Sequence, residues 1–233
     1  MKISEVSITA RHPGAAAAFY RDVLRMPVDE QSDRVTVTIG SSQLIITPGD
    51  QFEGIHHLAF GISPHDFDLA RRWLSEQIEP IVAQGSDVID GPAGWNSQSV
   101  YFHGPEEILL EFIARQADAE IPGGDGVAPR PFSISEVGMG VPDARAAVRE
   151  LTEALGLPTF PPQETHFAPV GDHDGLLIVV DQERVWFPTR THRAAHGPLT
   201  VRIEAPRHPG DVTLTEKVTV TTSIRGGPEA GGP

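Results

Sequence analysis

Ile-Ser-Glu-Val occupies residues 3–6 and recurs at residues 134–137. A motif that opens both halves of a chain indicates duplicated structural units. The segments that follow the motif repeat as well. Each copy leads into a strand pattern, a proline-containing turn and an alanine-rich helical pattern, which ends near Leu24 in the first half and near Leu155 in the second. The sequence therefore predicts a repeated unit made of a strand, a helix and further strands.

Length and charge limit the size of the core and the choice of partners. The 233 residues are enough for two domains of ordinary size. With 32 acidic and 18 basic residues the formal net charge is -14, which disfavours nucleic acid and anionic membranes because both bind clustered cations. The chain has no cysteine and no apolar run near the roughly 18 residues of a membrane span. We expect a cytoplasmic protein.

Hydrophobic periodicity divides residues 1–116 into two such units. Alternating apolar residues predict strands, and apolar residues at helical spacing predict two helices with one buried face each. The expected elements are strand 3–10, helix 16–24, hairpin 35–46, strand 55–62, helix 67–74, and strands 99–102 and 108–113.

The rest of the chain predicts a second domain with a less complete pattern. Residues 117–131 are rich in Ala, Gly, Pro and Asp and predict a linker. A third unit follows, and Leu199 opens a reduced fourth unit that has no helical pattern, so that residues 132–225 form the second predicted domain. Residues 226–233 have the composition of a tail.

Three ionisable residues lie within apolar strands of the first half. If the first two units pack side by side, Glu5 in the first strand faces His57 in the first strand of the second unit, and Glu111 joins them from its last strand. Two carboxylates and one imidazole suit a hard or borderline divalent ion such as Mn, Fe, Ni, Mg or Zn. The remaining coordination positions would be open, as a Lewis-acid catalyst requires.

Ordinary structural roles remain open for the same residues. Glu111 can pair with Arg115, and Glu5 can be solvated at a strand end. His56 competes with His57 as a ligand, although alternation along the strand places the two rings on opposite faces.

Four segments of the first half resemble the vicinal oxygen chelate superfamily, which includes glyoxalase I, extradiol dioxygenases and bleomycin-resistance proteins. The resemblance implies an α+β fold in which paired βαβββ modules close into a cup, here with a third module and a reduced fourth. The segments are Ile-Ser-Glu-Val (3–6), Phe-Tyr-Arg-Asp-Val-Leu (19–24), His-Leu-Ala-Phe (57–60) and Gly-Pro-Glu-Glu-Ile-Leu-Leu-Glu-Phe (104–112).

The resemblance also implies where a metal binds. Family members place ligands on the first strand of each module and on the last strand, which matches Glu5, His57 and Glu111 here. Glu5 stands where many members have histidine, and Ile46 stands where some supply a fourth ligand. In the second half Glu136 repeats Glu5, but Pro198 aligns with His57, so the sequence predicts no metal site there.

Aromatic and amide side chains precede the strand that carries Glu111. Trp95, Asn96 and Tyr101 are predicted to line a substrate pocket, since pockets combine apolar walls with a few polar groups. For Trp95 a packing role over the sheet edge is equally open.

These features lead to three hypotheses. The leading one is a metal-dependent lyase, isomerase or dioxygenase that chelates a small substrate through adjacent oxygens, with Glu5 or Glu111 moving the proton. The second is a metal-free small-molecule binding or resistance protein with the same cup. The third is a structural module that forms a homodimer through its sheets.

Overall fold

The computed structural model describes residues 1–204 and 208–223, and the predicted tail at 226–233 lies outside them. The strands are β1 (Lys2–Ala10), β2 (Val28–Glu30), β3 (Val35–Ile39), β4 (Ser42–Pro48), β5 (His57–Ile62), β6 (Ile89–Asp90), β7 (Ser97–His103), β8 (Leu109–Arg115), β9 (Ser133–Val141), β10 (Phe167–Asp172), β11 (Gly175–Asp181), β12 (Leu199–Glu204), β13 (Asp211–Thr215) and β14 (Val218–Ser223). The α-helices are α1 (Pro13–Ala18), α2 (Phe67–Gln77) and α3 (Ala144–Leu155). The predicted α+β class is confirmed.

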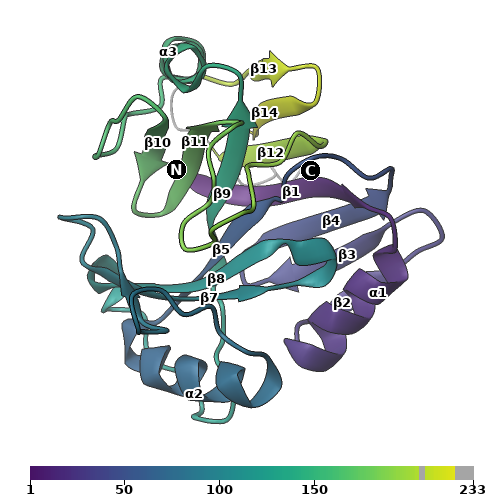
Figure 1. Ribbon diagram of the computed structural model, residues 1–233, viewed down its shortest axis with the longest axis vertical. Helices are drawn as coiled ribbons and strands as arrows, with labels where there is room; N and C mark the ends of the chain where they lie inside the picture. The colour runs from purple at the N-terminus through teal and green to yellow at the C-terminus, as the bar shows by residue number, and fades with distance from the viewer. Residues whose placement is uncertain (205–207, 224–233) are drawn as a thin grey trace, which may run out of the picture.

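Four modules follow one another along the chain (Figure 1). In each, the first strand pairs in parallel with the last: β1 with β4, β5 with β8, β9 with β11, and β12 with β14. The first two modules have the full strand, helix and three-strand pattern. The third reduces one strand to the isolated bridge between Thr159 and Val170, and the fourth has no helix among its described residues.

Local sequence explains the helix ends and the two short strands that periodicity missed. In α3, the Asp143 side chain caps the helix start by accepting the Ala146 N–H at 2.9 Å, and Gly156 ends it in a left-handed conformation with φ 65°. β2 and β6 are three and two residues long, which is too short to show an alternating pattern of apolar residues. No helix of the described segments is long and apolar enough to cross a membrane.

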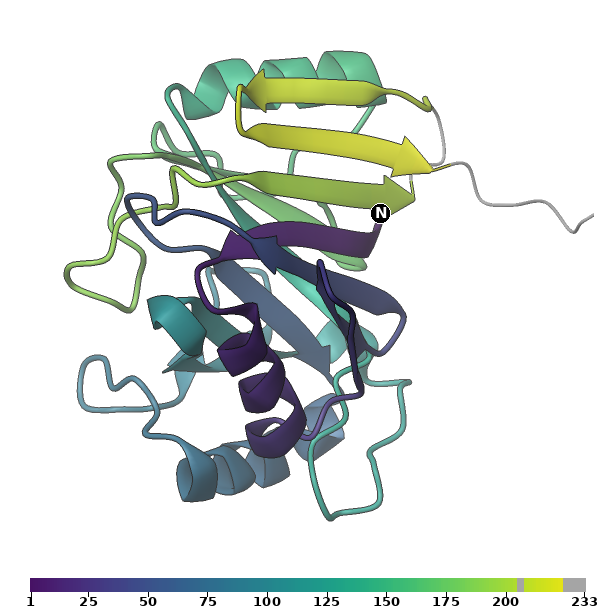
Figure 2. The ribbon, with the colours of Figure 1, turned by 90° about the vertical axis from the view of Figure 1, so that its right-hand side faces the viewer.

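The modules pair differently from the sequence prediction. β5 of the second module lies antiparallel to β9 of the third, and β1 of the first lies antiparallel to β12 of the fourth. Figure 2 shows the second contact, with β1 in purple beside β12 in yellow-green. The prediction that modules one and two pack side by side is therefore wrong, and segments 1–116 and 132–225 contribute to one 14-stranded sheet.

The repeated Ile-Ser-Glu-Val motif forms a β-bulge in both halves. Pairing between β1 and β12 shifts between Ile3 and Glu5, and pairing between β9 and β5 shifts at the equivalent place, so that Ser4 and Ser135 are the extra residues. A bulge lets two consecutive residues leave the regular alternation and turns the next side chain. The motif thus fixes the direction of the glutamate that follows each serine.

Two clusters of buried apolar side chains pack against the sheet. The larger one fills the space between the sheet and the three helices. The smaller one lies on the opposite face of modules two and three, where it fills the cup with side chains instead of a helix. Burying a large apolar side chain contributes about 1.5–3 kcal/mol. The members of this cup cluster are Ile55, Trp95, Leu109, Leu176, Ile178, Val180, Trp186 and Ala194.

Candidate metal centre

One row of residues crosses three strands in the cup of modules two and three. Ala59 on β5 lies opposite Glu111 on β8 and opposite Glu136 on β9. His57 lies two residues earlier on β5, on the same face of the sheet. Because Ala59 has only a methyl group, the two carboxylates can approach each other across it. The pairing of modules two and three thus brings His57, Glu111 and Glu136 together.

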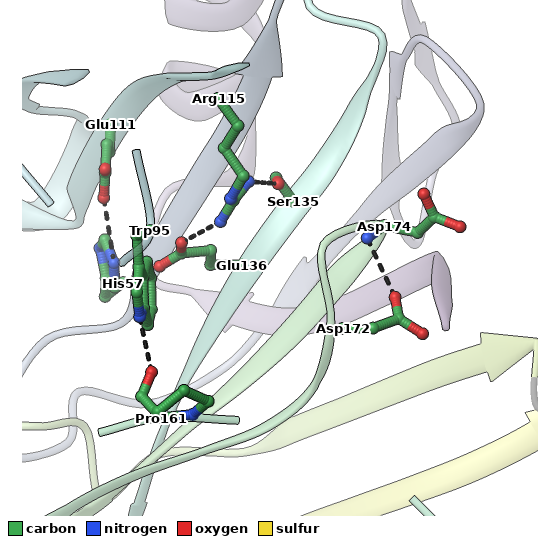
Figure 3. A network of polar contacts seen from close by, with 9 residues as sticks. All are labelled: His57, Trp95, Glu111, Arg115, Ser135, Glu136, Pro161, Asp172 and Asp174. Carbon is green, nitrogen blue, oxygen red and sulfur yellow. Dashed lines mark hydrogen bonds and ion pairs between the residues drawn. The ribbon is translucent and has the colours of Figure 1, made fainter. Parts of the chain in front are cut away.

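The three side chains form the group best suited to a metal ion in the described part of the chain. One ligand atom from each lies within 4.8 Å of the others. His57 Nε2 is 3.5 Å from Glu111 Oε2, and Figure 3 shows the two side chains facing each other. His57 Nδ1 lies 3.3 Å from the Leu109 carbonyl oxygen, which suits an N–H donor at that nitrogen. Nε2 then carries the lone pair and faces the carboxylate.

Arg115 from β8 is the one cation that contacts this group in the described structure. Its guanidinium donates to Glu136 Oε1 and to Ser135 Oγ, and it lies 5.9 Å from the centre of the Trp95 ring. The side chain is only 1% exposed. The sequence left open that Arg115 pairs with Glu111. In the structure Arg115 pairs with Glu136 instead.

Burial sets the protonation of the site. Desolvation, followed by the nearby charge of Glu136, raises the pKa of Glu111 to about 8, although the Ser99 and Tyr101 hydroxyls hydrogen-bond to that carboxylate and oppose the rise. Desolvation also raises the pKa of Glu136, against the attraction of Arg115. It lowers the pKa of His57 to about 4, so the imidazole is neutral at pH 7.

The donor set fits a divalent cation. Glu111 Oε2 is buried and has no hydrogen-bond partner in the protein, and the His57 lone pair faces it. Two electron-rich atoms 3.5 Å apart repel each other unless a proton or a metal ion lies between them. Arg115 neutralises only one of the two carboxylates, so the buried group needs one further positive charge. One nitrogen and two carboxylate ligands suit Mn, Fe, Ni, Mg or Zn.

Glu5 does not join this group. Its carboxylate Oε2 lies 3.6 Å from Arg202 Nη1 in the other cup, between modules one and four. Strand register makes Glu5 the counterpart of Glu136 and places Arg202 where the first cup has Ala59. The counterpart of Glu111 is Thr221. A guanidinium and a hydroxyl therefore occupy the positions that a metal centre would need.

The three residues predicted for the pocket have different positions. Tyr101 lies opposite Glu111 on β7 and stacks at 6.2 Å from the His57 ring. Trp95 is buried in the cup cluster, where its Nε1 donates to the Pro161 carbonyl at 2.6 Å. Asn96 is exposed at a turn with φ 47°, outside the cup. Tyr101 and Trp95 thus border the metal group, and Asn96 does not.

Sequence reasoning missed Glu136 and Trp186. The sequence predicted no separate metal site in the second half and did not consider Glu136 as a ligand for the site of the first half, whereas Glu136 belongs to the group of possible ligands. Trp186 packs 5.2 Å from the His57 ring and donates from Nε1 to the Ile55 carbonyl at 3.0 Å. The repeated motif was the available signal for Glu136. Residues 184–189, which contain Trp186, resemble segments of uncharacterised superfamily members, but that resemblance did not indicate contact with His57.

A glycine makes room for the Trp186 ring, which gives a direct test of the packing. A Cβ at Gly138 would lie 2.6 Å from the indole of Trp186 and 2.9 Å from His57 Cβ. We expect Gly138→Ala to cost about 1–3 kcal/mol of unfolding free energy, as overpacking does, and to change tryptophan fluorescence. Denaturant unfolding measures the cost. Gly14→Ala is the control, because a Cβ there meets nothing within 4 Å; equal losses in both variants would contradict the packing.

Comparison with known proteins supports the fold. No family model and no curated protein matches the sequence, but solved structures do. A "putative dioxygenase" from Bacillus subtilis is 14% identical with a TM-score of 0.59, over 95% of this chain and 85% of that chain. A lactoylglutathione lyase from Agrobacterium tumefaciens is 22% identical with a TM-score of 0.38, over 48% and 92%. A glyoxalase/bleomycin resistance protein/dioxygenase from Alicyclobacillus acidocaldarius is 19% identical with a TM-score of 0.42, over 52% and 96%.

The first of these similarities extends over nearly the whole chain and defines the structural class. The protein has the vicinal oxygen chelate fold, the fold of glyoxalases, bleomycin-resistance proteins and dioxygenases. The resemblance seen in the sequence is therefore confirmed for the fold. Within that fold, this chain has a buried group of His57, Glu111 and Glu136 beside Arg115.

Proposed function

We propose that this protein is a metal-dependent enzyme that acts on a small molecule with two adjacent oxygens, and that His57, Glu111 and Glu136 hold the metal. The observation that carries the proposal is the convergence of three ligand atoms within 4.8 Å, with Glu111 Oε2 buried and unpartnered. A bound divalent ion would act there as a Lewis acid that polarises a substrate oxygen. The fold supports this proposal without identifying the substrate.

The protein groups around the site have distinct roles in this proposal. Arg115 holds Glu136 in place through a buried ion pair, and the Tyr101 and Ser99 hydroxyls orient Glu111. In the metal-free protein burial raises the pKa of Glu111 to about 8, and a bound ion would take the place of that proton. We assign metal binding to all three side chains, and proton transfer to the Glu111 carboxylate when it is not bound to the ion.

The side chains that surround the site are mainly apolar. His57 and Glu111 are 5% and 1% exposed, and the Trp186 ring packs against that of His57. Apolar walls exclude water and strengthen electrostatic interactions with a bound substrate. The proposed substrate is accordingly small, with its adjacent oxygens as its main polar groups. The proposal includes lyase, isomerase and dioxygenase chemistry.

Metal content tests the ligand set. The purified protein is stripped with a chelator, reloaded in turn with Mn, Fe, Ni, Mg and Zn, and assayed for bound ion by elemental analysis. We expect about one ion per chain in the native protein. We expect that ion to be lost in His57→Ala and Glu111→Gln, because each change removes a ligand. Glu136→Gln should also weaken retention.

The matched control is Glu5→Gln, which changes the repeated glutamate in the other cup. It should retain metal as the native protein does, since Glu5 pairs with Arg202 outside the group. Full metal content in His57→Ala, or loss of metal in Glu5→Gln, would refute the assigned ligands.

One observation favours a second candidate, a metal-free binding protein. Arg115 already neutralises Glu136, so a proton on Glu111 would complete the charge of the site without a metal. The cup would then bind its ligand by shape and hydrogen bonding alone. Absence of any retained ion in the native protein under all five loadings would favour this candidate over the enzyme.

A further inference from the structure

A cavity of about 640 Å³ lies outside the cup of the metal centre. It is bordered by the ends of β1 and β4, by α1, by the segment of residues 51–56 that precedes β5, and by residues 105–108 and 191–193. In Figure 1 this is the region where α1 follows the end of β1. His56, the residue before β5, lines the cavity, and His57, the first residue of β5, belongs to the metal group.

Polar atoms without protein partners are concentrated at this cavity. Seven buried side-chain nitrogen or oxygen atoms in residues 1–204 and 208–223 have no hydrogen-bond partner, and four of them belong to residues that line it. They are Nδ1 and Nε2 of His56, Oγ1 of Thr9 and Nδ1 of His192. A buried polar atom that lacks a partner is destabilising. Neighbouring protein atoms cover these four, so a ligand reaches them only when the side chains turn into the cavity, and each turn gives an unpartnered atom the hydrogen bond that it lacks.

The rim carries charged groups that already have partners. Glu106 accepts the backbone N–H groups of Arg11 and His12 at 3.2 and 3.0 Å. Arg193 pairs with Glu183. Glu107 lies 3.7 Å from His103, Glu53 lies 3.8 Å from His196, and Arg11 lies 3.5 Å from the Gln51 amide oxygen. A charged ligand would have to compete with these contacts.

The walls between rim and floor are apolar. Ile8, Ala16, Tyr20, Ile46 and Ile108 are buried residues that line the cavity. Phe52 adds an aromatic ring, 5.0 Å from the ring of His56 and nearly edge-on to it. Ligand sites commonly combine such walls with a few polar groups that orient the ligand.

We propose that this cavity binds a small uncharged organic molecule, with its ring or aliphatic body against the apolar walls and its hydroxyl or carbonyl group on His56 and Thr9. The charged rim residues have contacts of their own, and the unpartnered atoms belong to imidazole rings and a hydroxyl group. The site is separate from the metal centre and stands whether or not the cup binds metal.

The test is a titration of the full-length native protein with three neutral probes, p-cresol, cyclohexanol and benzamide. Binding is followed by the side-chain nitrogen signals of ¹⁵N-labelled histidines, with the His56 signals assigned by their loss in His56→Phe. We expect at least one probe to shift the His56 signals saturably. Benzoate and benzylamine, the charged counterparts, should bind at least about tenfold more weakly, since each would enter an apolar site with its charge unpaired.

Variants locate the binding and keep the test independent of folding. Thr9→Val keeps the shape of the side chain and removes the unpartnered hydroxyl. Without a probe it should be as stable as the native protein or more so, and it should weaken binding about tenfold through the lost hydrogen bond. Glu111→Gln in the metal group should leave binding unchanged.

Three results would overturn the proposal. The first is no saturable shift with any neutral probe up to its solubility limit. The second is tighter binding of benzoate or benzylamine than of the neutral probes. The third is equal binding in Thr9→Val and the native protein. Loss of binding in Glu111→Gln would place the probe in the metal cup and overturn the proposal as well.

Discussion

Replacing Arg115 with Met is expected to lower the free energy of unfolding by about 3–5 kcal/mol, the usual cost of removing one partner of a buried ion pair. Arg115 is 1% exposed and holds both Glu136 and Ser135. Without the guanidinium, the Glu136 carboxylate remains buried with no counter-charge, which the fold tolerates only by protonating it. Urea denaturation with the native protein in parallel measures the difference.

Two further variants separate the charge effect from general damage. Arg193→Met removes a guanidinium from the exposed pair with Glu183 and should cost at most about 1 kcal/mol. Adding Glu136→Gln to Arg115→Met should restore part of the lost stability, because the remaining buried group is then neutral. A loss below about 1 kcal/mol in Arg115→Met would show that the pair is not desolvated as the structure has it.

Raising the pH from 6.5 to 8 should destabilise the metal-free protein by about 2 kcal/mol, because a shift of one pKa unit corresponds to about 1.36 kcal/mol. The pKa of Glu111 rises from 4.5 to about 8 on burial. In this window the native state keeps a proton that the unfolded state has lost, so stability falls as pH rises through the native pKa. The shift of Glu136 has the same sign.

The histidines contribute in the opposite direction, mainly below this window. Burial lowers the pKa of His56 and His57 from 6.5 to about 4. The unfolded state therefore takes up protons that the buried rings do not, and this source of stability is lost as pH falls from 6.5 towards 4. At pH 6.5 about half of these rings are still protonated in the unfolded state, so their deprotonation between pH 6.5 and 8 returns about 0.8 kcal/mol for the two rings and offsets part of the carboxyl effect.

Glu111→Gln is the matched variant for the pH experiment, since glutamine resembles the protonated carboxyl group in shape. Its stability should change little between pH 6.5 and 8. If the proposed metal is bound, the native protein should also resist the alkaline loss, because the ion replaces the proton on Glu111. An unchanged alkaline slope in Glu111→Gln would assign the loss to other groups.

The repeated units could be predicted from the sequence because their signals are local. Hydrophobic alternation in β1, β5 and β9, and the helical period of α2 and α3, depend on which face each residue buries. Strand β8, which carries Glu111, was likewise evident from its apolar residues. These signals depend on neighbours in the chain, and they were sufficient for the fold class.

The partner of each module could not be predicted, because every first strand offers a similar apolar edge. The sequence prediction joined neighbouring modules one and two. In the structure the register pairs Glu136 with Ala59 and Glu5 with Arg202. The same register shows that Thr200, not Pro198, stands two residues before Arg202, as His57 stands before Ala59. An alignment wrong by two residues hid the contrast between the cups.

The difference between the two cups explains which residues of the site could be predicted from the sequence. His57 and Glu111 belong to one module and were recognised together as charged groups in apolar strands. The third residue of the metal group is set by pairing between strands that are distant in the sequence. The choice between Glu5 and Glu136 could therefore not be made from neighbouring residues. The neighbouring side chains decide between the two glutamates. Arg202 lies beside Glu5, and its guanidinium fills the space that a metal cation would use, whereas Ala59 beside Glu136 leaves that space free.

Modules two and three pair with each other, and modules one and four, which flank them in the sequence, pair with each other as well. This order of pairing has a consequence for the growing chain. During synthesis the inner pair can close once β9 has emerged, after about half of the chain. β1 is made first, yet its partner β12 starts at Leu199. Contacts between such distant segments form slowly. β1, the first strand to be made, therefore keeps an unpaired edge for the longest time. This edge is where chaperone binding or mispairing between two nascent chains would begin.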